Sequence, residues 1–175
     1  MVDLSYPIGK FDRSVDATAE RRAAWIRDIA ETPAGLRDAV RGLSKAQLDT
    51  PYRPEGWTVR QVVHHLADSH MHAYARFRLA VTENEPTIKP YDEKLWAELA
   101  DARSAPVDLS LTLVDALHQR WALFLQSLTE ADFSRTLRHP EIGLVVLGPY
   151  LGSYAWHSRH HVAHITSLRE RMGWS

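Results

Sequence analysis

Histidine is the residue type in this chain with the clearest chemical potential, because ten are present and eight of them lie in two short segments. The segment WHSRHHVAHI near the C-terminus contains His157, His160, His161 and His164. In a helix, residues four apart lie one turn apart on the same face, so the segment offers two pairs, 157 with 161 and 160 with 164. Imidazoles at this spacing can bind one metal ion without breaking the helix.

The two pairs differ in the residues that share their faces. The face of His157 and His161 also carries four apolar residues, Tyr154, Ile165, Leu168 and Met172. The face of His160 and His164 continues with Ser167 and Arg171 and is typical of a solvent-facing surface. Burying two unpartnered imidazoles would cost about 1–3 kcal/mol each, and a metal ion would remove that cost. The alternatives are a histidine-rich surface helix or core histidines with ordinary hydrogen bonds.

The second segment, VVHHLADSHMH, contains His64, His65, His70 and His72. If the apolar stripe of this helix faces the core, His64 points away from it, His65 lies on its flank and His70 lies nearer its centre. Periodicity therefore slightly favours His70 over His65 as the inward-facing group, and spacing does not decide between them.

Two familiar metal signatures are absent from the sequence. A zinc-protease helix has glutamate directly after the first histidine of the pair, where this chain has Ser158 or His161. A di-iron bundle needs Glu-x-x-His on two helices and two further glutamates, which this chain lacks. A mononuclear site with mostly histidine ligands remains.

Helical periodicity predicts the elements that position these histidines. We expect long helices over residues 16–30, 57–81, 108–128 and 149–172, the second capped by Thr58 and the last ended by Gly173. We expect Pro33 to restart the chain into a further helical stretch, and residues 142–147 to be strand-like. Four long helices in 175 residues predict an all-α four-helix bundle with short extra helices, forming one domain over residues 1–175.

Composition excludes several classes of function. The net charge of −1 offers no basic field for nucleic acid. The chain has no cysteine, which excludes disulfides, zinc–thiolate sites and a cysteine nucleophile. The N-terminus does not have the pattern of a signal peptide, and the longest apolar run, residues 143–152, is too short to span a membrane. We expect a cytoplasmic protein with no membrane partner.

Several stretches are similar to one known family. GWTVRQVVHHLADSH, YAWHSRHHVAHI and RMGWS closely resemble the YfiT-like branch of the DinB superfamily, as do LSYPIG, LDTPYR and PYDEKLW. The branch includes proteins named as metal-dependent hydrolases and the bacillithiol S-transferases. The resemblance implies a bundle with up-down-down-up connectivity, often assembled as a homodimer.

The resemblance also implies a ligand set. The family's triad is one histidine of the HHLA helix and the H-x-x-x-H pair of the last helix, which correspond here to His65, His157 and His161. The resemblance thus favours His65 over His70 and agrees with the pair chosen from periodicity. It implies zinc or nickel as the metal cofactor.

Three neutral imidazoles would leave a divalent ion with an open position, and this predicts an enzyme with a small-molecule substrate. A water bound there would have its pKa lowered to about 7, as in metal-dependent hydrolases. A low-molecular-weight thiol cosubstrate would be deprotonated and could attack an electrophile. We slightly favour thiol transfer, because the sequence shows no well-placed general base. The nearest carboxylate in sequence is Asp68, at i+3 from His65, and it is interpreted first as a solvated residue or an outer-shell partner of an imidazole, with a base role as the less favoured alternative.

Other residues have weaker interpretations. His118 lies on the seam of its helix and is expected to be a hydrogen-bonded core histidine, with a role next to the metal as the alternative. Arg76, Arg78 and Arg159 could hold an anionic cosubstrate, although arginines on helix surfaces are usually solvated. The non-catalytic hypothesis is a structural metal module, in which His70, His164 or Asp68 completes a closed ligand shell.

Overall fold

The computed structural model describes residues 3–174. Met1 and Val2 of the N-terminal segment and Ser175 of the RMGWS motif lie outside this range, and the single domain of residues 1–175 stays a prediction. Within residues 3–174, no helix combines the length and apolar character that crossing a membrane requires.

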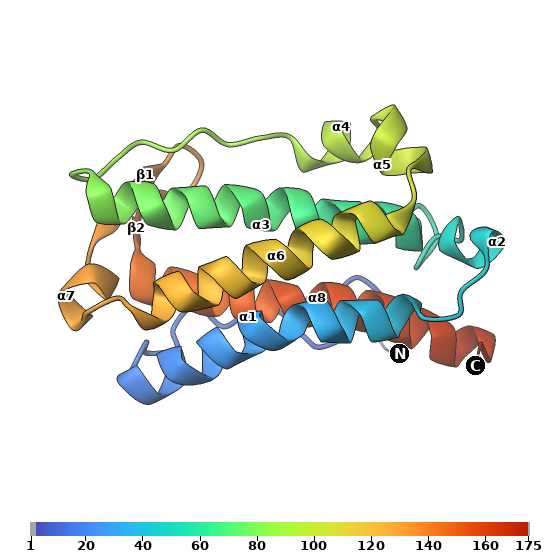
Figure 1. Cartoon of the computed structure of the whole chain (residues 1–175), viewed down its shortest axis with the longest axis horizontal. Helices are drawn as coiled ribbons and strands as arrows, with labels where there is room; N and C mark the ends of the chain where they lie inside the picture. Colours follow the sequence, from blue (N-terminus) through green and yellow to red (C-terminus); the bar gives the residue numbers. More distant parts are fainter. Residues whose placement is uncertain (1–2, 175) are drawn as a thin grey trace.

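Four long helices form the bundle, and they are α1 (Ala19–Val40), α3 (Val59–Thr82), α6 (Val107–Gln126) and α8 (Leu147–Met172). In Figure 1, α1 and α8 run in one direction, and α3 and α6 run in the other. The connection from α3 to α6 therefore returns along the whole bundle, and it carries α4 (Glu93–Ala97) and α5 (Ala100–Ser104). This is the expected up-down-down-up four-helix bundle.

Shorter elements complete the connections. Helix α2 (Lys45–Leu48) joins α1 to α3, and α7 (Glu130–Phe133) follows α6. Strands β1 (Thr136–His139) and β2 (Gly143–Val146) form an antiparallel hairpin in which Thr136 pairs with Val146. The strand-like segment predicted at residues 142–147 is therefore confirmed, while its partner β1 was not predicted.

Local capping explains where the helices begin and end. The Thr58 side chain accepts a hydrogen bond from the Gln61 amide, and the Gln61 side chain accepts one from the Thr58 amide at 2.9 Å, so the predicted cap is confirmed as a capping box. Gly173 ends α8 in the left-handed conformation at φ 64°, as predicted. Helix α8 begins at Leu147, two residues before the predicted start, because proline at position 149 lies in the first turn, where the backbone N–H groups have no helical partner.

The prediction that Pro33 restarts the chain is wrong, because α1 continues through it. Proline has no N–H, so the carbonyl oxygen of Ile29, four residues earlier, lacks its helical hydrogen bond. His118 of α6 supplies a replacement, with its Nδ1 atom 2.6 Å from that oxygen. A contact from another helix thus satisfies the backbone group that the proline leaves free.

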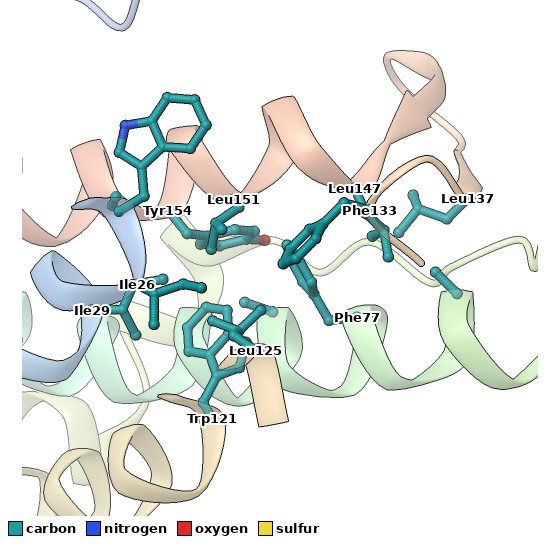
Figure 2. Packing of buried hydrophobic residues seen from close by; sticks show 14 of the residues in the cluster. Ile26, Ile29, Phe77, Trp121, Leu125, Phe133, Leu137, Leu147, Leu151 and Tyr154 are labelled. Carbon is teal, nitrogen blue, oxygen red and sulfur yellow. The ribbon is translucent and has the colours of Figure 1, made fainter. Parts of the chain in front are cut away.

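The core is divided into two apolar clusters along the bundle axis. The first is built around residues of all four helices that include Ile29, Phe77, Trp121 and Leu151, and Figure 2 shows these side chains packed together. The second cluster lies toward the other end and includes Leu36, Leu66, Leu111, Ile165 and Leu168. On three of the four helices, the boundary between the clusters is occupied by histidine.

Candidate metal centre

The layer between the two clusters gathers histidines from three helices. His65 and His70 come from α3, His118 from α6, and His157 and His161 from α8. His70 and His118 are completely buried, and His65 and His161 are nearly so. Polar side chains in the middle of a bundle need partners, and these imidazoles find them in one another.

Three of these imidazoles point the same atom toward a common point. The Nε2 atom of His157 lies 3.3 Å from Nε2 of His65 and 3.0 Å from Nε2 of His161. One ring nitrogen of each lies within 4.8 Å of those of the other two. Two nitrogens at tetrahedral positions about 2.0–2.1 Å from one ion lie about 3.3 Å apart. The spacing of this triad, His65, His157 and His161, therefore fits a single divalent ion.

The protonation state of the triad fits an ion as well. Burial, followed by the charges of His164 and His160, lowers the pKa of His65 to about 4. Burial also lowers the pKa of His157 and of His161 well below the ordinary value. All three rings are therefore neutral near pH 7, and only a neutral imidazole offers a lone pair to a metal.

Behind His157, a row of hydrogen bonds runs into the core. Nδ1 of His157 lies 3.2 Å from Nε2 of His70, and Nδ1 of His70 lies 2.7 Å from Nε2 of His118. The row ends at the carbonyl oxygen of Ile29, which can only accept, so Nδ1–H of His118 is the donor. We call His157, His70, His118 and the Ile29 carbonyl the inner row.

The Ile29 carbonyl at the end of the inner row determines which nitrogen of each histidine in the row carries the proton. A neutral His118 with its proton on Nδ1 accepts at Nε2, so His70 must donate from Nδ1 and accept at Nε2. His157 then donates from Nδ1, which leaves the lone pair of its Nε2 facing the triad. Outer partners of this kind are what orient the histidine ligands of metals. The Ile29 carbonyl, which Pro33 leaves without a helical partner, therefore ends a chain of hydrogen bonds that directs the Nε2 lone pair of His157 toward a metal ion.

A second row supports His161 by the same logic. Nδ1 of His161 lies 3.4 Å from Nδ1 of His164, and Nε2 of His164 lies 3.2 Å from the carbonyl oxygen of Ser5. Because this carbonyl also only accepts, His164 donates to it and accepts from His161, whose Nε2 keeps its lone pair for the triad. We call His161, His164 and the Ser5 carbonyl the outer row.

The expectation that His160 and His164 face solvent is wrong, since their exposed fractions are 6% and 3%. The N-terminal segment, residues 3–18, lies against this face of α8. Besides the bond to Ser5, Nε1–H of Trp156 donates to the Gly9 carbonyl at 3.1 Å, and the Tyr6 ring lies 5.7 Å from that of His160. Helical periodicity could not reveal this cover, because it comes from a distant segment without regular secondary structure.

The triad lies on a cavity of about 370 Å³. Its walls include Trp57, Ser69, Arg76, Tyr91 and Trp156. His157 is only partly buried, so the point where the three Nε2 atoms converge can be reached from the cavity. A site of this kind has room for a small molecule beside the triad.

Three other predicted site residues, His70, His118 and Asp68, differ in how close the structure places them to the triad. His70 points inward as periodicity predicted, but it lies behind His157 rather than in the triad. His118 is the buried, hydrogen-bonded histidine that was expected. Asp68 is half-buried and is absent from the residues lining the cavity, so the structure does not bring it to the triad. Burial, and then the carboxylate of Asp101, raises the pKa of Asp68 to about 6.

Comparisons with known proteins identify the family of this chain. The family model described as the DinB superfamily matches residues 28–165. A protein of Bacillus mycoides (strain KBAB4) named "Putative metal-dependent hydrolase" is 55% identical over 174 residues, covering 99% of this chain and all of the relative. A protein of Bacillus cereus (strain B4264) with the same description is 54% identical over the same length and coverage.

A solved structure is also similar over nearly its full length. It is YfiT from Bacillus subtilis, described as "a probable metal-dependent hydrolase with an unusual four-helix bundle topology". It superimposes with a TM-score of 0.95 at 51% identity, covering 98% of this chain and 99% of that one. With a family match over most of its length and relatives above 50% identity over almost all of it, this chain belongs to the DinB superfamily.

Proposed function

We propose that this chain is a metal-dependent enzyme that binds one divalent ion through the Nε2 atoms of His65, His157 and His161. The observation that carries the proposal is the convergence of these three atoms on a cavity of about 370 Å³, with Nε2 of His157 3.0 Å from that of His161 and 3.3 Å from that of His65. The names of the relatives support the same class of protein. Zinc or nickel as the ion, and a homodimer as the assembly, stay predictions.

The residues around the triad define what the chain itself contributes. The inner and outer rows hold His157 and His161 with their Nε2 lone pairs directed at one point, which prepares the site before any ligand arrives. Trp57 packs against His65, with ring centroids 4.6 Å apart, and restricts that ring as well. A divalent ion bound there would supply Lewis acidity, which lowers the pKa of a bound thiol or water.

Between the two reactions that this chemistry allows, we favour transfer of a small thiol to an electrophile. Hydrolysis of an amide or ester relies on a general base close to the reacting atoms. The carboxylates that line the cavity, Glu93 and Glu141, are both exposed, and Asp68 does not line it. A thiol needs less help, because its ordinary pKa is already far below that of water.

Hydrolysis is the second candidate, and the names of the relatives favour it. Its base would have to be a residue of the cavity rim, such as Glu93 or Glu141, after movement toward the triad. A structural module is the third reading. In such a module the protein would fill every coordination position of the ion, and the cavity would not bind a substrate.

The test combines metal analysis with two activity assays. We expect purified wild-type protein to contain about one equivalent of metal, and His157→Ala to contain almost none. His160→Ala is the matched control, because it lies on the same helix and offers no nitrogen to the triad, so we expect it to keep the metal. Wild-type protein without stoichiometric metal would overturn the proposal.

The two reactions are separated with the metal-loaded protein. Conjugation of monochlorobimane to glutathione, cysteine or coenzyme A measures thiol transfer, and release of nitrophenol from 4-nitrophenyl esters measures hydrolysis. We expect conjugation that His157→Ala abolishes. Ester hydrolysis without conjugation would replace the first candidate with the second, and loaded protein inactive in both assays would favour the structural module.

A further inference from the structure

Arg76 of α3 is a buried cation on the wall of the triad cavity. Its exposed fraction is 8%, and it lines the same cavity as His65, His157 and His161. Nη1–H donates to the hydroxyls of Tyr150 at 3.2 Å and Tyr154 at 3.1 Å. Nη2–H donates to the Lys89 carbonyl at 3.4 Å, and Nε has no hydrogen-bond partner among residues 3–174. None of these partners is a carboxylate.

Two other arginines are buried to the same degree and provide a comparison. Arg22 is 7% exposed and pairs with the carboxylate of Glu130, and Arg60 is 5% exposed and pairs with Asp49 at 2.7 Å. Over residues 3–174, Arg76 has no carboxylate within 4.0 Å. A buried charge without a counter-ion is costly, so proteins normally pair it. Of these three arginines, Arg76 is the one without a carboxylate partner, and it lies on the wall of the triad cavity.

Two exposed carboxylates, Glu93 and Glu141, also line the cavity of Arg76, whereas the formal charges on the neighbouring cavity are positive. A second cavity of about 480 Å³ adjoins the first, since Ser69, Trp156 and His157 line both. Lys10 and Arg13 of the N-terminal segment add two further positive charges to its lining. Within residues 3–174, no aspartate or glutamate lines this second cavity.

The tyrosines beside Arg76 leave a further donor. The hydroxyls of Tyr150 and Tyr154 lie 3.0 Å apart, and both accept from Arg76. One of the two hydroxyl protons is used between them, so the other is available to an acceptor. A cation and an O–H donor side by side are suited to the oxygens of an anion.

We propose that Arg76 is the counter-ion of the substrate, and that the substrate class is small molecules carrying a carboxylate or phosphate group held between Arg76 and the triad. The reacting end of the substrate would lie at the triad and its anionic end at Arg76. This orientation rests on the proposed function of the triad, whereas binding of an anion at Arg76 does not depend on it.

Binding is tested on metal-free protein, because an anion could otherwise bind the ion itself. Calorimetric titration uses benzoate, its neutral amide benzamide, and inorganic phosphate. We expect millimolar or tighter binding of benzoate or phosphate and at least about tenfold weaker binding of benzamide, since charge-assisted hydrogen bonds would be lost. Binding of benzoate would identify the anionic group as a carboxylate, and binding of phosphate would identify it as a phosphate. Failure of both anions to bind, or equal binding of benzoate and benzamide without phosphate binding, would overturn the proposal.

Variants separate Arg76 from general charge effects. We expect Arg76→Gln to weaken anion binding at least about tenfold and Arg76→Lys to restore part of it. Arg78→Gln is the matched control, because Arg78 lies on the same helix, is exposed, and donates to Tyr74 outside the cavity. Circular dichroism and the Tm confirm that each variant folds. Unchanged anion binding in a folded Arg76→Gln variant would overturn the assignment.

The same variants keep the two proposals distinguishable. His157→Ala removes a triad nitrogen and should leave anion binding to metal-free protein within about twofold, since the anion contacts Arg76. Arg76→Gln should leave the metal content unchanged and raise the KM of the loaded enzyme for an anionic substrate more than that for a neutral one. Anion binding in a protein that binds no metal would refute the metal centre and leave the anion site standing.

Discussion

The inner and outer rows support two ligands of the same triad, and they differ in what anchors them. The inner row ends on the Ile29 carbonyl inside α1, and its last two contacts are 2.7 and 2.6 Å. The outer row ends on the Ser5 carbonyl in the N-terminal segment, and its contacts are 3.4 and 3.2 Å. Both use a carbonyl, which can only accept, to fix where the histidine protons lie.

This difference indicates a division of labour between the rows. The inner row has members on all four long helices and lies between two apolar clusters, so it can move only if the bundle loosens. The outer row depends on a segment that has no regular secondary structure, and segments of this kind generally open at a lower free energy than the core of a bundle. We infer that the inner row determines the geometry of the triad, and that the outer row can yield when a substrate enters.

Acidification should produce the largest effect, because it charges both rows. Burial lowers the pKa of His118 and of His164 to about 4, against an unfolded value of 6.5. A folded pKa below the unfolded one adds stability that is present above about pH 6.5 and is lost as the pH falls toward 4. We expect the free energy of unfolding of metal-free protein, from urea titrations, to be flat between pH 7 and 8 and to fall by several kcal/mol between about 6.5 and 4.

Single variants then compare the rows under acid. His118→Gln should flatten the acid loss in the global unfolding curve. His164→Gln should act mainly on the N-terminal segment, seen as altered hydrogen exchange of residues 3–18 with a smaller change in global stability. A stability curve that does not change between pH 7 and 4 would show that these imidazoles are not held neutral.

Breaking the inner row should have the next largest effect. His70→Leu has similar volume but can neither accept from His157 nor donate to His118, and we expect metal affinity to fall about 10–100-fold. His70→Gln can do both and should recover part of the affinity. ¹⁵N shifts of the His157 ring report its tautomer directly. A His157 tautomer unaffected by His70→Leu would contradict the ordering of protons along the row.

Breaking the outer row should cost less. His164→Leu removes the partner of His161 and the bond to Ser5, and we expect metal affinity to fall by no more than about tenfold, the low end of the range for outer-shell partners. Hydrogen exchange of residues 3–18 should become faster in the same variant. If His164→Leu weakens metal binding more than His70→Leu, the proposed division between the rows is wrong.

The smallest effect is expected from Pro33→Ala. The new N–H can bond to the Ile29 carbonyl in the helix and would compete with His118 for it, although a carbonyl oxygen has two lone pairs and can accept twice. We expect a Tm equal to or above that of the wild type, since alanine is the better helix former, and a weaker hydrogen bond from His118, read from its ¹⁵N shifts. An unchanged His118 signal would show that the proline is not needed to free the carbonyl.

Much of the fold follows from local patterns in the chain. The cap at Thr58, the end of α8 at Gly173 and the four long helices depend on contacts between near neighbours in sequence, so periodicity and capping rules find them. The continuity of α1 through Pro33 does not follow from local patterns. The Ile29 carbonyl that the proline leaves without a helical partner is bonded instead to Nδ1 of His118, which lies on another helix. Local rules correctly identify the lost hydrogen bond and cannot see its replacement.

The candidate site divides in the same way. Spacing and the apolar face of the last helix selected His157 and His161, because a helix places these two residues together whatever surrounds it. The choice of His65 came from the family resemblance, and only the packing of α3 against α8 and α6 gave both His65 and His70 a place, one in the triad and one behind it.

What the sequence by itself determined is therefore the set of helices and the pair of imidazoles one turn apart, since both arise within a few residues of one another. What only the tertiary structure decided is which groups complete that pair. The N-terminal segment that covers His160 and His164, the carbonyls that end the two rows, and the unpaired charge of Arg76 on the cavity all join segments far apart in the chain. Hydrogen bonds and charges act through space, so their partners are set by packing and cannot be read from neighbouring residues.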